Sequence, residues 1–339
     1  MVNVKAYISS NFTKSFLTIF LPFFLIISLV YLVKISALTA KIQITFIELL
    51  SLYAYSVPDI IFYTLPLSFI ASLANVLTKL SQDNELMALY ALGLKAKKIL
   101  ASILLLAFLF SLLLLSISFL AMPLSKQFYN AFKEEKKAEA KLNIVAGKLG
   151  QKFGNYYIYV KDEKEGIFND LVIYNRTDKK NEQFFSSQTG QIKHKEMLTS
   201  LLLNKGYGYT YSENRLQQSK YKTLEVYDSA QQKGFTFEGV AAHWTKAKDN
   251  IKMMHRLLFF IFVSLIPLLS VYLIAAFTMI NPRYQSNRSF IVIFVSTLGL
   301  YTIASSLEKW GNFFTLGMSI LFVISLGYWL FTKRVARYF

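Results

Sequence analysis

The amino-acid sequence predicts an α-helical membrane protein with six transmembrane helices, arranged three and three around an inserted all-β domain. Six long apolar segments carry this prediction, together with one polar stretch that separates the third segment from the fourth. Each segment is about as long as the ~20 residues that a helix needs to cross a bilayer. A helix in a water-soluble core has no reason to be apolar on every face over that length. The segments cover approximately residues 16–33, 57–77, 99–122, 257–280, 290–306 and 313–331.

The first apolar segment follows Lys5 and Lys14, as the apolar region of a secretory signal peptide would. It is longer than the ~7–15 residues of such a region, and no clear Ala-x-Ala cleavage site follows it. We therefore interpret it as a retained span. The six segments leave room for only one soluble domain in a chain of 339 residues.

The loop between the second and third spans, residues 77–95, has the pattern of a short amphipathic helix at about residues 79–93. Ser81 or Asp83 can cap such a helix, and acidic residues suit its positive end. Gly93 can end it in the left-handed conformation. One interpretation is a connector that rests on the lipid headgroups. The other is a coupling helix that docks into a groove on a cytosolic ATPase, for which the candidate residues are Asp83, Glu85, Leu86, Met87, Tyr90 and Gly93.

The polar insert begins with a Lys-, Glu- and Ala-rich stretch, residues 124–142, that predicts a helix leaving the membrane. Short β-rich runs separated by Gly, Asn and Asp follow, and this pattern is typical of antiparallel hairpins. We expect a small antiparallel sandwich or barrel. The runs are residues 155–160, 170–174, 184–192, 198–203, 207–211 and 221–227.

The placement of the charges predicts the orientation. The net charge is +17, and residues 125–256 hold 23 basic and 15 acidic residues. If the N-terminus is cytoplasmic, eleven Lys and Arg residues lie at the inner ends of the spans and three at the outer ends. This positive-inside bias places both termini in the cytoplasm and the β domain on the other side. Membrane topology thus explains much of the charge, and no basic-aromatic reader motif predicts a nucleic-acid partner.

The sequence predicts neither an enzyme nor a metal or cofactor site. His194, His243 and His255 have no metal-binding spacing, and there is no cysteine. Neither a nucleophile-elbow Gly-x-Ser-x-Gly nor a phosphate-binding loop occurs. If the protein uses ATP, we expect a separate subunit to hydrolyse it.

The loop and two further motifs resemble the lipopolysaccharide-export permeases, LptF/LptG. The further motifs are Thr64-Leu-Pro-Leu-Ser68 and Asn281-Pro-Arg283, and the second leans toward the F-type subunit. The resemblance covers essentially the whole chain. It implies a bacterial inner-membrane location and a periplasmic β-jellyroll, somewhat shorter here than in many members. It also implies that Glu85, with its neighbours Leu86, Met87 and Gly93, contacts the ATPase.

The partners that this resemblance implies are a second permease subunit, a cytosolic ABC ATPase dimer, a periplasmic jellyroll lipid-bridge protein and lipopolysaccharide itself. The implied function is extraction of lipopolysaccharide from the periplasmic leaflet and its passage toward the outer membrane. Two further hypotheses concern the lipid. Lys34 and Lys41 are candidates for binding the phosphates of the headgroup, although a lysine at a helix end commonly only snorkels to the interface. Tyr156, Ile158 and Val160 share one strand face that could shelter acyl chains, or could form a dry core.

The expected division is residues 1–123 for the first three spans, 124–256 for the β domain with its helical connectors, and 257–339 for the last three spans. Two other functions stay open at this point. An ion-coupled secondary transporter would need ionisable groups near the middle of the membrane, whereas Asp59 and Glu308 stand near span ends. A non-transporting membrane scaffold for envelope assembly would need no ATPase at all.

Overall fold

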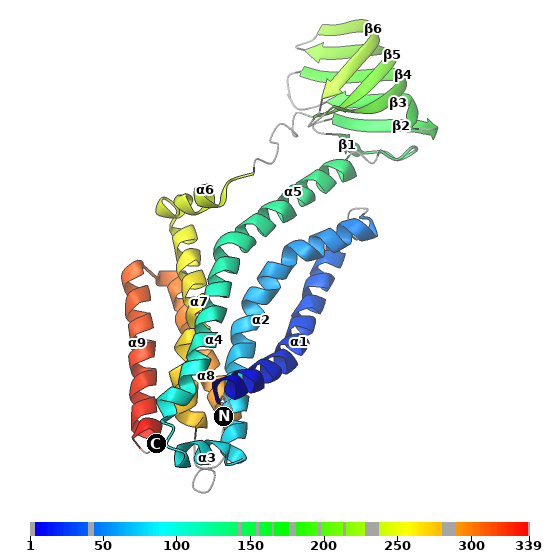
Figure 1. Ribbon diagram of the computed structural model, residues 1–339. Helices are drawn as coiled ribbons and strands as arrows, with labels where there is room; N and C mark the ends of the chain where they lie inside the picture. Colours follow the sequence, from blue (N-terminus) through cyan, green and yellow to red (C-terminus); the bar gives the residue numbers. More distant parts are fainter. Residues whose placement is uncertain are drawn as a thin grey trace. The chain divides into compact units, whose positions relative to one another are not determined.

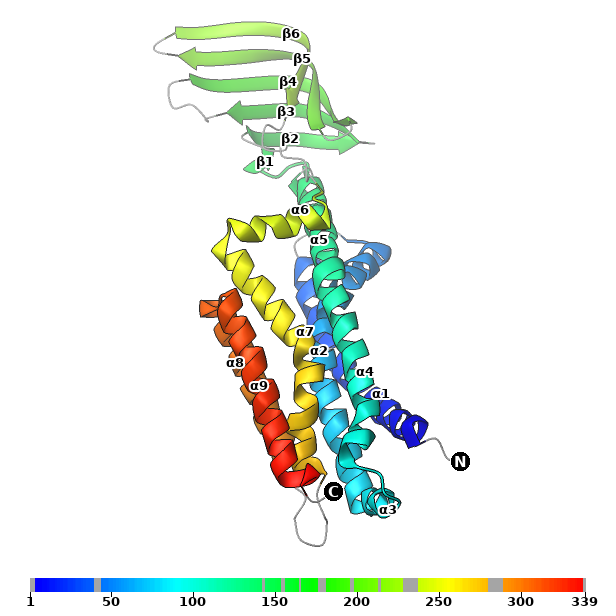
Figure 2. The ribbon, with the colours of Figure 1, turned by 60° about the vertical axis from the view of Figure 1, so that its left-hand side comes forward.

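The chain forms two compact units, which we describe separately. One comprises Met1–Ala37, Phe46–Tyr129 and Glu238–Phe339, and the other comprises Leu38–Thr45 and Asn130–Phe237. The structure is a computed structural model (Figures 1 and 2). It describes residues 4–39, 44–141, 144–153, 156–164, 166–175, 181–195, 198–212, 215–227, 237–279 and 289–337.

The first unit is helical. Across the described residues, six helices are long and apolar enough to cross a membrane, which confirms the predicted class. They extend beyond the apolar segments because their polar end turns are also helical. The α-helices of the described residues are α1 (Val4–Thr39), α2 (Phe46–Gln82), α3 (Glu85–Ala91), α4 (Ala96–Ser116), α5 (Met122–Lys141), α6 (Val240–Thr245), α7 (Ile251–Thr278), α8 (Ser289–Trp310) and α9 (Phe313–Phe331). The part of α5 from Asn130 on belongs to the second unit.

Helix α7 is the centre of this unit and packs against α2, α4, α8 and α9. An aromatic cluster joins the start of α1 to α2 and α4: the ring centroids of Phe12 and Phe69 are 5.0 Å apart, and those of Phe16 and Phe110 are 4.8 Å apart. Helices α2 and α7 are the most buried spans, whereas α1 and α9 are the least. Apolar side chains on α1 and α9 therefore face outward, toward lipid or another protein.

The Thr64–Ser68 motif lies in the buried part of α2. The Thr64 hydroxyl donates to the Ile60 carbonyl at 2.8 Å, and the Ser68 hydroxyl donates to the Thr64 carbonyl at 2.9 Å. Each buried hydroxyl is thus satisfied by its own helix, as it must be away from water. The short side chains let α2 approach α7, the usual role of small residues in membrane helices. The motif Asn281-Pro-Arg283 lies outside the described residues.

A π-helical turn, Ile117–Ala121, joins α4 to α5, and the chain leaves and re-enters the helical unit close to it. The Trp244 indole nitrogen of α6 donates to the Phe119 carbonyl of this turn at 2.9 Å. The Glu238 backbone nitrogen donates to Gln127 Oε1 at 2.8 Å. The segment that leads out of the helical unit and the segment that leads back into it are therefore joined by two hydrogen bonds within that unit.

The second unit contains a six-stranded antiparallel sheet with the strands in sequence order, β1-β2-β3-β4-β5-β6. This confirms the inserted all-β domain, and its connections are those of a meander. The strands are β1 (Gln151–Phe153), β2 (Tyr156–Lys164), β3 (Ile167–Asn175), β4 (Asn181–Lys195), β5 (Leu198–Ser212) and β6 (Arg215–Tyr227).

The strands are longer than predicted, and one predicted break was wrong. Residues 198–203 and 207–211 belong to the single strand β5, which continues through Gly206 and Gly208. Gly206 does not turn the chain but lets two strands approach. A Cβ atom there would lie 2.0 Å from the Ser186 carbonyl oxygen and 2.5 Å from the Tyr221 hydroxyl. Because glycine suits both turns and close approaches, sequence alone does not separate the two.

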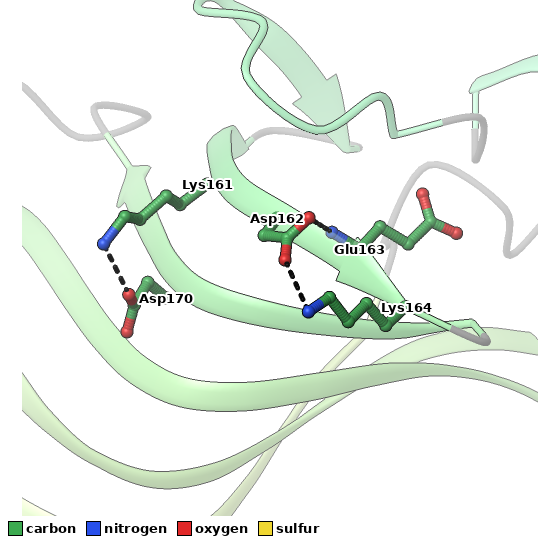
Figure 3. Close-up of polar contacts among 5 residues, drawn as sticks. All are labelled: Lys161, Asp162, Glu163, Lys164 and Asp170. Carbon is green, nitrogen blue, oxygen red and sulfur yellow. Dashed lines mark hydrogen bonds and ion pairs between the residues drawn. The ribbon is translucent and has the colours of Figure 1, made fainter.

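The β2–β3 hairpin shows the two faces of the sheet. On one face Ile158 and Val160 are buried, together with Leu171 and Ile173. On the exposed part of the hairpin, Lys161 contacts Asp170 at 3.2 Å and Lys164 contacts Asp162 at 3.9 Å (Figure 3). Exposed pairs of this kind contribute ~1 kcal/mol or less. The sheet is therefore held mainly by its buried face and its backbone ladder.

Candidate functional site

The predicted coupling segment folds as α3, a helix of seven residues between α2 and α4. In both ribbon views α3 lies at the same end of the helical unit as the C-terminus. The predicted cap was wrong. Ser81 belongs to α2, and Asn84 occupies the N-cap position in the left-handed conformation (φ 60°) without a side-chain hydrogen bond to the helix. Helix α2 simply runs further than the pattern indicated, and asparagine tolerates the sharp turn that follows it.

The C-terminal end of α3 agrees with the prediction. Gly93 has a φ of 81°, in the left-handed region that favours glycine. Its nitrogen donates to the Tyr90 carbonyl at 2.9 Å, and the Leu94 nitrogen donates to the Leu89 carbonyl at 3.2 Å. These two bonds form a Schellman motif, which satisfies the last carbonyls of the helix. The chain thereby turns sharply and enters α4 at Ala96.

Glu85 is bonded to the first turns of α1. The Tyr7 hydroxyl donates to Glu85 Oε2 at 2.7 Å, across 78 residues of sequence. Glu85 also stands in the first turn of α3, where a negative charge favours the positive end of the helix dipole. One carboxylate thus joins α3 to α1. Residues so distant in sequence give no local signal of their pairing, so sequence reasoning did not find Tyr7.

The apolar face of α3 packs inward. Leu86 is buried with 2% of its surface exposed, and Leu89 and Tyr90 pack partly against the core of the helical unit. Burial raises the pKa of the Tyr90 hydroxyl above its ordinary value. Leu86 and Tyr90 accordingly fix α3 in place. Met87 is half-buried.

The opposite face of α3 is open. Asp83, Ala88 and Gly93 are exposed, and Leu92 is 78% exposed. We call Asp83, Ala88, Leu92 and Gly93 the outer face of α3. Leu92 was missed because the apolar face predicted from the sequence comprised only Leu86, Met87, Leu89 and Tyr90. Leu92 directly precedes Gly93 and lies in the turn itself. This position is the sequence signal that could have distinguished Leu92 from the inward-facing apolar residues of α3.

A second group of charged residues lies at the other end of the spans. Asp59 of α2 interacts electrostatically with Lys126 of α5, Lys34 of α1 and Arg256 of α7. The three cations outnumber the carboxylate, so the group is basic overall. The Lys34 ammonium also lies 5.6 Å from the centre of the Tyr31 ring. Lys41 lies outside the described residues.

Comparison with known families gives one match. The model of the family described as "Lipopolysaccharide export system permease LptF/LptG" matches residues 6–333 of the 339. The chain belongs to this family. No curated protein sequence matches it.

Membership of the LptF/LptG family makes the chain a permease of lipopolysaccharide export, a transporter component and a multi-pass inner-membrane protein. It also implies that the chain works in a complex with partner subunits. Over the part of the chain that the structure describes, no three His, Asp or Glu side chains lie close enough together to hold a metal ion.

The three β-domain residues singled out from the sequence lie on the buried face of the sheet or pack against it. Ile158 and Val160 are buried, at 2% and 0% exposure, and Tyr156 packs beside them. Tyr157, between them in sequence, points to the opposite face and is 42% exposed. The face is closed in this conformation, so an acyl chain could enter only if its side chains move apart.

Proposed function

We propose that this chain is one permease subunit of an ATP-driven lipopolysaccharide exporter, in which a separate cytosolic ABC ATPase dimer docks on the outer face of α3. The observation that carries the proposal is the division of α3 into two faces. Leu86 and Tyr90 hold the inward face in the core, while Asp83 and Leu92 are exposed. An exposed leucine at one end of a fixed helix and an exposed carboxylate at the other suit docking into a groove.

The connections of α3 support a mechanical role. Only the residues between Gln82 and Glu85 separate it from α2, and only those between Ala91 and Ala96 separate it from α4. The Tyr7–Glu85 hydrogen bond adds α1. A displacement of α3 by the ATPase would therefore be passed directly to three spans. ATP hydrolysis itself belongs to the partner, and the chain needs no cofactor of its own.

The lipid path begins at the other end of these spans. We place the lipid phosphates near Lys34, with Lys126 and Arg256 completing the basic group. Lys41 stays a candidate from the sequence alone. Lysine suits phosphate as a point charge. A cavity for so large a lipid needs a second permease subunit to close it, and the poorly covered faces of α1 and α9 offer apolar surface for that purpose.

The β domain, on the periplasmic side in this account, receives the extracted lipid. Acyl chains enter the face formed by Tyr156, Ile158 and Val160. Strand β6 ends the sheet, so within the described strands its outer backbone edge is unpaired. Such an edge can accept a strand from a periplasmic jellyroll bridge protein. Both termini and α3 are then cytoplasmic.

A photo-crosslinking amino acid at Leu92 tests the docking. We expect an adduct, in native membranes, with a protein that mass spectrometry identifies by its phosphate-binding loop. Trp310, 84% exposed at the end of α8, is the matched control site and should give no such adduct. Equal labelling of the ATPase from both sites, or from neither, would refute docking at α3.

Crosslinkers at Lys34 and Val160 test the lipid path. We expect lipopolysaccharide adducts at both, and at Val160 only while ATP is being hydrolysed, because that face is closed at rest. Lys309 and Tyr157 are the controls: another lysine at an outer helix end and the opposite strand face. Adducts at the controls as frequent as at the test sites would remove the support for this path.

A further inference from the structure

A small pocket lies between the start of α1 and the start of α4. Its volume is about 50 Å³, enough for a few waters or one compact ion. Its wall is mostly apolar, and three of its lining residues, Lys5, Lys98 and Ser102, have polar side chains. The lining residues are Val4, Lys5, Ile8, Leu94, Lys98, Ile99 and Ser102.

The charged residues that line this pocket are both basic. No acidic residue lines it, and no ion pair joins Lys5 or Lys98 to another described residue. The neighbouring Lys97 is engaged elsewhere, since its ammonium donates to the Tyr328 hydroxyl at 2.9 Å. The pocket also adjoins the first turn of α4, which has no acidic residue and no side-chain cap. The positive end of that helix dipole is therefore uncompensated by the protein.

Ser102 is a second, independent observation that points to a ligand. It lines the pocket, is 6% exposed, and its buried hydroxyl has no hydrogen-bond partner. Buried serines of α2 behave differently: the Ser68 and Ser72 hydroxyls each donate to the carbonyl four residues earlier. A buried hydroxyl without a partner costs free energy, and an anion beside it would accept its proton.

We propose that this pocket binds a phosphate group, with Lys5 and Lys98 as the cationic ligands and the Ser102 hydroxyl as a neutral donor. Lys98 directly precedes the apolar run of α4, so the pocket lies where the span meets the headgroup layer. Basic pockets between spans at this depth suit anionic lipid headgroups. The phosphodiester of an anionic phospholipid is the first source of the group, and free phosphate is the second.

This site is distinct from the lipid path proposed above, because it lies at the α3 end of the helical unit. A phosphate bound there would link α1 to α4. Both helices are connected to α3: α1 through the Tyr7–Glu85 hydrogen bond, and α4 through the short segment that contains Leu94. Binding needs no ATPase, so its failure or success says nothing about ATPase docking.

The test measures lipid binding to the full-length chain by native mass spectrometry, with dioleoylphosphatidylglycerol against dioleoylphosphatidylcholine. We expect the anionic lipid to bind preferentially. Lys5→Gln with Lys98→Gln should weaken that binding about tenfold, and Ser102→Ala about threefold. The cationic ligands are exposed side chains, so the double variant should fold.

Matched controls are Lys14→Gln, an exposed lysine of α1 outside the pocket, and Ser111→Ala. Ser111 of α4 is also buried and without a hydrogen-bond partner, but it does not line this pocket. Both controls should bind phosphatidylglycerol like the wild type. A second outcome is that inorganic phosphate at equal concentration displaces the lipid, with its own binding weakened by the same variants. That result would support the phosphate site, with free phosphate as its ligand. Equal binding of the two lipids, or wild-type binding by the double variant, overturns the proposal.

Discussion

Tyr7 and Glu85 show how one hydrogen bond joins distant parts of the helical unit. The bond is 2.7 Å long and lies in an exposed position. Such a bond contributes modestly to stability, but it orients α3 relative to α1. The charge of Glu85 and the bond to Tyr7 are therefore separable properties of one side chain.

Tyr7→Phe should remove the bond and keep the charge. We expect retention of the ATPase, measured by co-purification at increasing salt, to fall by less than about fivefold, the equivalent of one ordinary hydrogen bond. Tyr53→Phe is a suitable control. It removes a different hydrogen bond, which Tyr53 of α2 donates to Ser28 of α1 and which does not involve α3. A loss as complete as that caused by reversing the charge of Glu85 would mean that the bond, not the carboxylate, is what matters.

At the scale of single elements, the end of α3 depends on one backbone conformation. Gly93 has open space around it, with nothing within 4 Å of an added Cβ atom, so a side chain there would clash with no neighbour. The difficulty is the positive φ, which costs an ordinary L-residue roughly 1–2 kcal/mol.

Gly93→Ala should therefore weaken ATPase retention clearly, whereas Gly93→Asn, which tolerates the left-handed conformation better, should weaken it less. Co-purification of both variants under the same conditions measures the difference. Equal behaviour of the two would show that the turn conformation does not set the position of α3.

In the β sheet, Gly206 is needed for the close approach of two strands and not for a positive φ. Gly206→Ala should destabilise the β domain by roughly 3 kcal/mol or more, because the new methyl group would overlap the backbone of β4. Proteolysis of the full-length chain, followed by mapping of the fragments, measures it: cuts should appear within the sheet. Gly299→Ala in α8, with open space around its Cβ position, is the control. An intact sheet in Gly206→Ala would mean that β4 and β5 can separate without cost.

How far the sequence predicts these elements depends on the range of the interactions involved. The six spans, the helix after Pro123 and the left-handed Gly93 follow from composition and local pattern. The capping at Asn84, the unbroken β5 strand and the Tyr7–Glu85 bond do not. Each of these three depends on a neighbour far away in the sequence, or on where an adjacent helix stops. The exposure of Leu92 also required knowing which side of α3 faces the core.

In the proposed function, three spans connect the docking element α3 to the lipid path. Within the helical unit, α3 is hydrogen-bonded to α1 and joined to α2 and α4 by short turns. The basic residues Lys34 and Lys126 lie on α1 and α5. A scaffold protein would need none of this coupling. An ion-coupled transporter would not respond to changes on α3 that leave the spans intact.

The most direct test is the charge reversal Glu85→Lys, which puts a positive charge at the positive end of the α3 dipole, removes the bond to Tyr7 and so displaces the outer face of α3. Glu163→Lys, on an exposed part of β2, is the matched control. Two quantities are measured: the amount of ABC ATPase that co-purifies from mild detergent, and ATP-dependent release of lipopolysaccharide from proteoliposomes. The account predicts that wild type and Glu163→Lys retain both, while Glu85→Lys stays folded and loses both. Full ATPase retention and full release by Glu85→Lys would contradict it.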